Sequence, residues 1–246
     1  MYRSFRIKFS RLGPVKYLGH LDMLRYFQKV ILRSNLPIRY SEGFNPHQIM
    51  SFAYPLGVSM ETMGDYLDID LVFDDSFEFS DVNREIAYCN QMKDAMNNVI
   101  DEGIAIEGVS LVPTGELNAM AAVYAADYSI RCKSDKNITP AMIQDYLAQP
   151  EILILKESKK SKKGDAPNVI DIKEGILSFS LASSYSPDTF VFSASLRSGS
   201  EMNIKAQTLV QSFGEFCQAN LFITELKRVE LYRMSPKGIV SLGDFS

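Results

Sequence analysis

The chain has 246 residues and a formal net charge of −4, and 46% of its residues are hydrophobic, 23% charged and 11% aromatic. These proportions are typical of an ordinary globular protein, and they exclude a disordered chain. Fourteen glycines and ten prolines are also too few for a fibrous or low-complexity protein.

The first half of the chain shows strand and helix patterns in the order βαββαβ. Alternating apolar and polar residues predict a strand over 5–9, which ends at Gly13-Pro14. Apolar residues at helical spacing predict a helix over 20–34, with basic residues on its other face. The remaining predicted elements are strands over 49–54 and 66–73, a helix from Ser80 or Asp81 to residue 100, and a strand over 104–112.

The second half repeats this order approximately, after a turn at Pro113-Thr114-Gly115. Its predicted elements are a strand over 122–132, a helix over 139–148, a strand over 152–156, a hairpin over 174–196, a helix over 203–218 and a strand at 229–232. Two copies of one topology predict an α+β protein of two tandem ferredoxin-like (βαββαβ) domains with antiparallel sheets. We place the N-terminal domain at 1–113 and the C-terminal domain, with extra strands, at 121–246.

Charge is distributed unevenly along the chain. Residues 1–50 contain nine Lys or Arg and two acids, whereas residues 51–109 contain thirteen acids and two bases. A basic segment with Tyr, Phe and His is suited to RNA, because Arg and Lys attract phosphates and aromatic rings stack on bases. The alternative is that the two segments neutralise each other within one domain. The lysine run at 159–163 is typical of a solvated loop, with a phosphate-contacting arm as the alternative.

The cysteines and the hydropathy pattern indicate a cellular compartment. Cys89, Cys132 and Cys217 are far apart, with no C-x-x-C pair and no closely spaced trio for an iron–sulfur cluster. Scattered thiols are typical of a reducing environment. The N-terminus lacks the apolar run of a signal peptide, and no stretch is long enough to span a membrane. We therefore predict a cytoplasmic protein without membrane contact.

Both histidines lie in the first 50 residues. His20 belongs to Tyr17-Leu18-Gly19-His20-Leu21-Asp22, and His47 ends the loop Tyr40-Ser41-Glu42-Gly43-Phe44-Asn45-Pro46-His47. Histidine exchanges protons near neutral pH and a carboxylate can orient it, so the candidate catalytic residues are His20, Asp22, Glu42 and His47. Two histidines with a carboxylate can also ligate a metal, and a structural role in a helix start or a turn is a further alternative. No H-E-x-x-H motif, nucleotide motif or nucleophile elbow accompanies them, and we predict neither a metal nor a cofactor.

The acidic segment 65–70 alternates carboxylates with apolar residues. On a strand, Asp68 and Asp70 share one face while Leu67 and Ile69 fill the other. We expect the acidic face to be solvated, and magnesium binding by that face is the alternative.

Three ordered motifs resemble a known bacterial family. They are Phe9-Ser10-Arg11-Leu12-Gly13-Pro14 through Asp22, the loop 40–47, and Ser51-Phe52-Ala53-Tyr54-Pro55-Leu56-Gly57-Val58 continuing to Tyr66-Leu67-Asp68. Over residues 1–110 the chain resembles the radical-SAM-associated domain of unknown function, which is encoded beside, or fused to, a larger radical SAM protein. The resemblance implies a partner that holds the iron–sulfur cluster and S-adenosylmethionine. In that family a basic residue often follows the loop histidine, whereas Gln48 follows it here.

The resemblance and the charge pattern together favour an RNA-binding accessory partner of a radical SAM enzyme that modifies tRNA or rRNA. Glu42, Asn45 and the two histidines line the predicted recognition cleft, and the backbone of Gly43 can contact a phosphate. The predicted phosphate contacts are Arg3, Arg6, Lys8, Arg11, Lys16, Arg25 and Arg39, and the predicted stacking residues are Tyr17, Tyr40 and Phe44.

Two other functions stay open. One is a self-sufficient, RNA-directed enzyme in which His20 and His47 are acid and base. The other is a protein-docking module whose basic segment binds an acidic surface without RNA. Fold analogy favours RNA, because tandem ferredoxin-like domains recur in RNA-processing nucleases and tRNA pseudouridine synthases, although the aspartate motif of the latter is not recognisable here.

Overall fold

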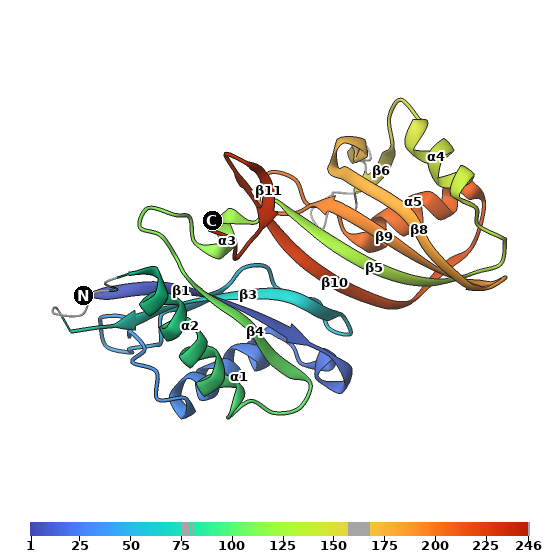
Figure 1. Ribbon diagram of the computed structural model, residues 1–246. Coiled ribbons are helices and arrows are strands. Elements are labelled where there is room, and N and C mark those ends of the chain that lie inside the picture. The colour runs from blue at the N-terminus through green and yellow to red at the C-terminus, as the bar shows by residue number, and fades with distance from the viewer. Residues whose placement is uncertain (75–78, 80, 157–167, 246) are drawn as a thin grey trace. The chain divides into compact units, whose positions relative to one another are not determined.

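The computed structural model describes residues 1–74, 79, 81–156 and 168–245 (Figure 1). The lysine run predicted as a loop at 159–163 lies outside the described residues. The chain is an α+β protein with a large mixed β-sheet, and its described part contains five α-helices. The chain divides into two compact units: unit 1 is Met1–Tyr124 with Lys227–Ser246, and unit 2 is Ala125–Leu226.

Unit 1 begins with the predicted order βαββαβ. Its elements are β1 (Tyr2–Arg11), the 3-10 helix η1 (Gly13–Tyr17), α1 (His20–Arg33), β2 (Met50–Phe52), β3 (Glu61–Val72), α2 (Val82–Asn97), β4 (Ile104–Leu111) and α3 (Ala119–Ala122), followed much later by the second part of β10 (Leu221–Ser235) and by β11 (Gly238–Ser241). Strand β1 lies between β4 and β3 and is antiparallel to both, and β2 is antiparallel to β3. The predicted start of the second helix rests on a real cap, since Asp81 accepts a hydrogen bond from the backbone N–H of Arg84.

The sheet is mixed, which corrects the prediction of purely antiparallel sheets. Lys227 and Arg228 of β10 pair with Glu61 and Thr62 of β3 in parallel. The reason is that the last long strand does not end with unit 2, but continues alongside β3 in the same direction. Strand β11 then returns antiparallel to β10.

The core of unit 1 lies between its sheet and the helices α1 and α2, which Figure 1 shows on the same side of β1 and β4. Alternation along β1 and β3 sends one set of side chains toward the helices, and these side chains are fully buried. The strand side chains are Phe5, Ile7 and Phe9 of β1 and Leu67, Ile69 and Leu71 of β3. They pack with Phe27, Val30 and Ile31 of α1, which are also buried. The opposite set of β1 and β3 side chains includes Arg6, Lys8, Asp68 and Asp70.

Unit 2 contains the elements predicted between residues 122 and 218, together with a short strand at 168–171, a 3-10 helix at 173–175 and the first part of β10, which the patterns missed. The strand predicted at 229–232 lies in the part of β10 that belongs to unit 1. The elements of unit 2 are β5 (Ala125–Ser134), α4 (Pro140–Ala148), β6 (Leu153–Lys156), β7 (Asn168–Asp171), the 3-10 helix η2 (Lys173–Gly175), β8 (Ile176–Ser186), β9 (Thr189–Arg197), α5 (Ala206–Cys217) and the first part of β10. The strand order is β10-β5-β9-β8, and β6 and β7 form a separate two-stranded sheet. In the core of unit 2, the ring of Phe213 makes edge-to-face contacts with the rings of Tyr146, Phe179 and Phe192.

The predicted domain division at 1–113 and 121–246 stays a prediction. The compact units place β11 and the second part of β10 with the N-terminal residues rather than with the C-terminal ones. Among the helices that the structure describes, none is long and apolar enough to cross a membrane.

Candidate functional site

The basic strand β1 and the acidic strand β3 neutralise each other inside unit 1. Arg6 is 1% exposed, and its guanidinium donates to both carboxylate oxygens of Asp68, at 2.8 and 3.0 Å. It also donates to the backbone carbonyls of Leu242 and Leu117, and Asp68 accepts from the backbone N–H of Ala119 at 2.6 Å. We therefore remove Arg6 from the phosphate contacts. Asp68 is buried and paired, so the expectation of a solvated face is wrong for this residue, because the strand register sets it opposite Arg6.

Arg11 is also used within the fold. Its buried guanidinium donates to the backbone carbonyls of Leu18, Gly57 and Met60, at 2.9 to 3.1 Å. Burial lowers the pKa of Arg11, an effect that the nearby Asp65 carboxylate opposes. These hydrogen bonds link the segment before α1 to the loop after β2. Arg11 is therefore not accessible to a phosphate, and we remove it from the predicted phosphate contacts as well.

The sequence patterns missed a buried charge pair beside Arg11. Asp65 accepts from Nη2 of Arg228 at 2.7 Å and from the backbone N–H of Tyr66 at 2.8 Å. Arg228 also donates to the backbone carbonyl of Tyr54 at 2.9 Å. Burial raises the pKa of Asp65, and the guanidiniums of Arg228 and Arg11 oppose that rise. The pairing of Arg228 with a residue 163 positions earlier leaves no local signal in the sequence.

Three further basic residues have carboxylate partners at the surface of unit 1. The pairs are Lys8 with Glu230, Arg39 with Asp70, and Lys16 with Glu61. Arg39 also lies over the ring of Tyr2, 3.8 Å from its centroid, and Arg3 donates to the backbone carbonyl of Tyr2. These side chains are part-exposed, so they reach a phosphate only by sharing or leaving their present partners.

The outward face of α1 carries a row of exposed basic side chains. Arg25, Lys29 and Arg33 follow one another at four-residue spacing, which places them along one side of the helix. The side chain of Arg25 is 72% exposed, and its nearest carboxylate, Asp22, lies 4.0 Å away. Tyr17, just before the helix, is 64% exposed. This row is the part of the predicted basic segment that remains accessible to a phosphate.

The loop 40–47 is a tight excursion that exposes an aromatic ring. A β-bridge joins Tyr40 to Gln48, and the hydroxyl of Ser41 contacts Nδ1 of His47 at 2.8 Å. Gly43 has a φ of +114°, a conformation that glycine adopts readily. Phe44 at the tip is completely exposed, as are its neighbours Glu42 and Asn45 to a large extent.

Gln48 connects this loop to α1. Its side chain is buried, and Nε2 donates to the backbone carbonyl of Gln28 at 3.2 Å. A basic side chain at this position would bury a charge against the helix, which explains in physical terms why Gln48 suits this chain. Gln48 thus links the loop to α1, and we use the name α1–loop surface for the exposed residues of both elements and of the turn before the helix: Tyr17, Arg25, Lys29, Arg33, Tyr40 and residues 42–45.

His20 and His47 each contact other residues of unit 1. The ring of His20 packs edge-on against Phe52, with 5.3 Å between the ring centroids, whereas His47 is held by Ser41 in the exposed loop. In the described part of the chain, no hydrogen bond or ring contact joins the two histidines. Asp22 lies in the first turn of α1, where a carboxylate is favourable at the helix N-terminus.

A narrow pocket lies beneath His20. Its walls are Phe9, Arg11, His20, Met23, Phe52, Pro55, Leu56 and Asp65, and it has room for about one water molecule. The motifs 9–22 and 51–58, which carry the family resemblance, supply all of these residues except Met23 and Asp65. Sequence-distant motifs therefore meet at this pocket, and Arg11 ties them together.

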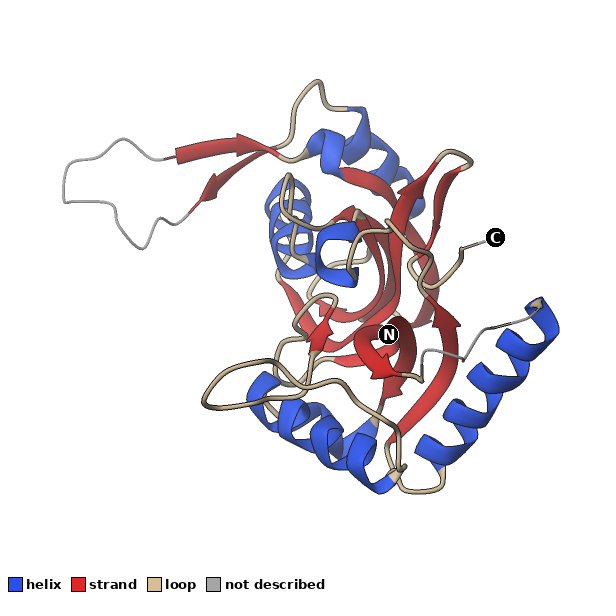
Figure 2. Ribbon diagram, turned by 90° about the vertical axis from the view of Figure 1, so that its left-hand side faces the viewer, coloured by secondary structure: helices blue, strands red, loops and turns tan. Residues whose placement is uncertain are grey.

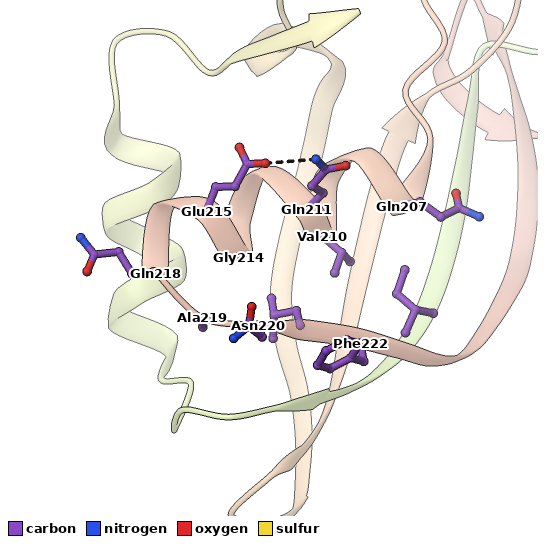
Figure 3. A pocket seen from close by; sticks show the side chains of 11 residues that line it. Gln207, Val210, Gln211, Gly214, Glu215, Gln218, Ala219, Asn220 and Phe222 are labelled. Carbon is purple, nitrogen blue, oxygen red and sulfur yellow. Dashed lines mark hydrogen bonds between the residues drawn. The ribbon is translucent and has the colours of Figure 1, made fainter. Parts of the chain in front are cut away.

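Unit 2 has a larger groove of about 570 Å³ between α5 and the start of β10 (Figure 3). Its lining includes Gln207, Gln211, Gln218, Asn220 and Phe222, and no Lys, Arg or His. Figure 3 shows Gln211 beside Glu215, whose carboxylate accepts a hydrogen bond from the Gln211 amide at 3.0 Å. A groove whose single charged group is a carboxylate does not attract phosphates.

The alternative of a metal site depends on the acidic, histidine and cysteine side chains of the described residues. Within the residues that the structure describes, no group of three or more His, Cys, Asp or Glu side chains is arranged to hold a metal ion. The carboxylates Asp68 and Asp70, which offered magnesium binding as an alternative, are engaged with arginines.

The fold and the site define an α+β protein whose first unit presents a basic helix and an aromatic loop. Residues 4–206 match a family model described as an uncharacterized protein conserved in bacteria (DUF2344). The chain belongs to this family. A comparison with curated proteins finds no match.

Among solved structures, the chain is similar to a chain in the crystal structure of a Cbf5-Nop10-Gar1 complex, with a TM-score of 0.50 and 9% sequence identity. The alignment covers 92% of this chain and 48% of that chain. This chain thus spans about half the length of its structural relative, and at this identity the likeness concerns the fold alone.

Proposed function

We propose that this DUF2344 protein binds RNA through the α1–loop surface, as the accessory partner of a radical SAM enzyme that modifies tRNA or rRNA in the cytoplasm. The observation that supports the proposal is that unit 1 exposes both the basic row Arg25, Lys29 and Arg33 of α1 and the ring of Phe44 at the tip of the loop 40–47. Cations supply sequence-independent attraction to phosphates, and exposed rings stack on unpaired bases. The buried arginines Arg6 and Arg11 have no part in it.

The radical SAM partner rests on the motif resemblance. Two of the three motifs, 9–22 and 51–58, converge at the pocket beneath His20, so they describe one place in the folded chain, whereas the loop 40–47 does not line this pocket. Such a partner supplies the cluster and S-adenosylmethionine, while this chain contributes contacts to the RNA.

Two tandem ferredoxin-like units are part of the same proposal. The strand order β4-β1-β3-β2 with two helices in unit 1, and β10-β5-β9-β8 with α4 and α5 in unit 2, support it. The fold likeness to the Cbf5-Nop10-Gar1 complex covers nearly the whole chain and is compatible with this arrangement.

The test is RNA binding by the full chain across a salt series, measured by fluorescence anisotropy with labelled bulk tRNA. The variant Arg25→Ala/Lys29→Ala/Arg33→Ala removes the row, and the matched control Lys133→Ala/Lys136→Ala/Lys205→Ala removes three exposed lysines of unit 2. We expect the α1 variant to bind more weakly and to lower the slope of log affinity against log salt by about two to three.

Two results count against the proposal. One is an affinity that barely changes between low and physiological salt, since phosphate contacts release counterions. The other is an equal loss in the α1 variant and in the unit 2 control, which assigns the binding to overall charge. The pairing of His20 with His47 as acid and base is not carried forward, because no contact between the two rings supports it.

A further inference from the structure

The groove of unit 2 lies along an edge of strand β10. Leu221, Phe222 and Ile223 all line it, although successive side chains of a strand point to opposite faces of the sheet. A groove that all three residues reach borders the edge of the strand rather than one face, and Figure 3 shows it between α5 and the strand. Strand β5, the neighbour of β10 on its other side, supplies no residue to this lining.

This edge of β10 is open beside the groove. The sheet order places β10 between β5 and β3, and the described pairing with β3 begins only at Lys227. Among the strand pairings that the structure describes, Leu221–Thr224 therefore has a neighbouring strand on the β5 side only. The separate strands β6 and β7, which Figure 2 shows extending away from the helices of unit 2, contribute no lining residue either. An open edge presents backbone N–H and C=O groups with which another chain can pair.

The end of the groove between α5 and β10 is held by hydrogen bonds. The Asp135 carboxylate accepts from the backbone N–H of Asn220 at 2.9 Å and from its side-chain amide at 2.6 Å. The backbone N–H of Ala219 donates to the carbonyl of Gly214 at 2.9 Å, and a Cβ at Gly214 would lie only 2.9 Å from the carbonyl oxygen of Ala219. Glycine thus permits the close approach of helix and turn, and a ligand meets walls that need little further ordering.

Helix α5 gives the groove a polar, weakly negative wall. Its exposed side chains toward the groove recur at helical spacing, and they are Gln207, Gln211, Glu215 and Gln218. Side-chain amides both donate and accept hydrogen bonds, which suits the peptide groups of a bound chain. Glu215 is the single charged lining residue and lies in the last turn of α5, where the free carbonyls of the helix add partial negative charge. A cationic group is therefore favoured at this end, and the phosphates of an RNA are not.

We propose that unit 2 binds an extended peptide segment of a partner protein, which adds a strand to β10 at Leu221–Thr224 and places a lysine or arginine beside Glu215. Strand addition supplies main-chain hydrogen bonds, and side chains at alternate positions supply specificity. Phe222, whose side chain is 65% exposed, offers apolar contact to the added strand. The site is independent of the proposed RNA binding by the α1–loop surface and does not rest on it.

The probe is a short synthetic peptide in which valine and threonine alternate between two terminal lysines. Its binding to the isotope-labelled full chain is followed by NMR of the backbone amides. We expect saturable shifts at Leu221–Thr224 and along the exposed row of α5. Successive N–H groups of a strand point to opposite sides, so only one alternate set pairs with β10. Methylating that set of peptide nitrogens should weaken binding by about tenfold or more, and methylating the other set by about twofold or less.

Two variants of the protein test the groove itself. Gln211→Trp fills it and should abolish the shifts, whereas Gln144→Trp, at an exposed glutamine of α4, is the matched control and should keep them. Glu215→Gln should weaken the lysine peptide by about twofold to fivefold and leave a peptide with terminal glutamines unaffected. Equal thermal unfolding temperatures of the two tryptophan variants show that lost binding is not lost folding, and the methylated peptides test strand addition on the unaltered chain.

Four results overturn the proposal. The first is the absence of saturable shifts with the probe at millimolar concentration, and the second is equal binding of both methylated peptides. The third is a shift of the same signals when the protein alone is concentrated, which assigns the edge to a second copy of this chain. The fourth is a shift of the same signals by bulk tRNA, which assigns the groove to RNA. RNA binding that persists in Gln211→Trp separates this site from the proposed function.

Discussion

Arg6 on β1 and Asp68 on β3 are register partners, and the guanidinium of one donates to both carboxylate oxygens of the other. One row of the sheet thus pairs the most basic segment of the sequence with the most acidic one. The same relationship repeats nearby, where Arg39 pairs with Asp70 at 3.2 Å. The charge asymmetry of the sequence is therefore partly a device for holding unit 1 together, and only the residues left over are available to RNA.

Removing one partner of this pair is expected to destabilise unit 1 strongly. In Arg6→Ala, Asp68 remains as a buried carboxylate without its counter-ion, and such losses cost about 3–5 kcal/mol. Urea unfolding of the full chain measures it as a lower midpoint at an unchanged slope. Arg25→Ala, on the exposed row, is the control and should change the free energy of unfolding by less than about 0.5 kcal/mol. Similar effects of the two variants would contradict the buried role of Arg6.

Gly64 is expected to reject a side chain because β3 approaches β10 closely there. A Cβ at Gly64 would lie 2.7 Å from the backbone carbonyl oxygen of Val229, and a backbone atom cannot move aside as a flexible side chain does. Gly64→Ala should lower the free energy of unfolding by about 1–3 kcal/mol, measured by denaturant titration. Gly108→Ala is a fair control, since nothing lies within 4 Å of its Cβ. A neutral Gly64→Ala would show that the two strands separate easily.

The sequence predicted most elements because they rest on local periodicity. The helix at 20–34 is amphipathic, and the helix after Asp81 begins with a side-chain cap, so both have signals within a few residues. The parallel pairing of β10 with β3 has no such signal, since it joins positions 166 residues apart. Strand β7 was missed because four residues carry too little periodicity.

The candidate site was predictable to a smaller extent. The exposed aromatic loop followed from Gly43 and Pro46, which favour a turn whatever the rest of the chain does. Which basic residues are buried and which are exposed could not be predicted, because Arg6 and Arg25 cannot be distinguished until the strand register is known. Alternation of Arg6 and Lys8 on one strand and of Asp68 and Asp70 on another was the one available clue to cross-strand pairing.

Phe44→Ala tests the stacking role of the loop tip. Because Phe44 is completely exposed, its removal should leave the thermal unfolding temperature unchanged. Loss of one base–ring stack is worth about 1–3 kcal/mol, so RNA affinity should fall by about 5-fold to 160-fold. Val58→Ala, at another exposed apolar residue of unit 1, controls for a general loss of apolar surface. Unchanged RNA affinity in Phe44→Ala would remove the loop tip from the interface.

Thiol labelling tests the packing of both units. Burial raises the pKa of Cys89 to about 11 and that of Cys132 to about 12, so the reactive thiolate is scarce in the folded chain. Cys217 is only half-buried. A thiol reagent at pH 8 should therefore modify Cys217 first and all three cysteines only after denaturation, as counted by intact mass spectrometry. Fast labelling of Cys132 in the native protein would contradict the buried position of β5.

Asp171 is expected to make the two-stranded sheet β6–β7, here called the ribbon, sensitive to acid at its base, where Ile152 and Ile172 are buried. Hydrogen bonds from the backbone N–H groups of Lys173 and Ile152 lower the pKa of this carboxyl, because they favour its charged form. A lowered folded-state pKa means that the stabilisation is present above the unfolded pKa of about 3.9 and is lost as the pH falls through the folded value.

Hydrogen exchange of the Ile152 and Lys173 amides, followed by NMR from pH 6 to pH 3, measures this loss directly. After correction for the intrinsic exchange rate, protection should decline at the acid end in the wild type and be low at every pH in Asp171→Ala. Asp171→Asn keeps an acceptor oxygen but cannot titrate, so its protection should be independent of pH. If acid loosens Asp171→Asn as much as the wild type, another group controls the base of the ribbon.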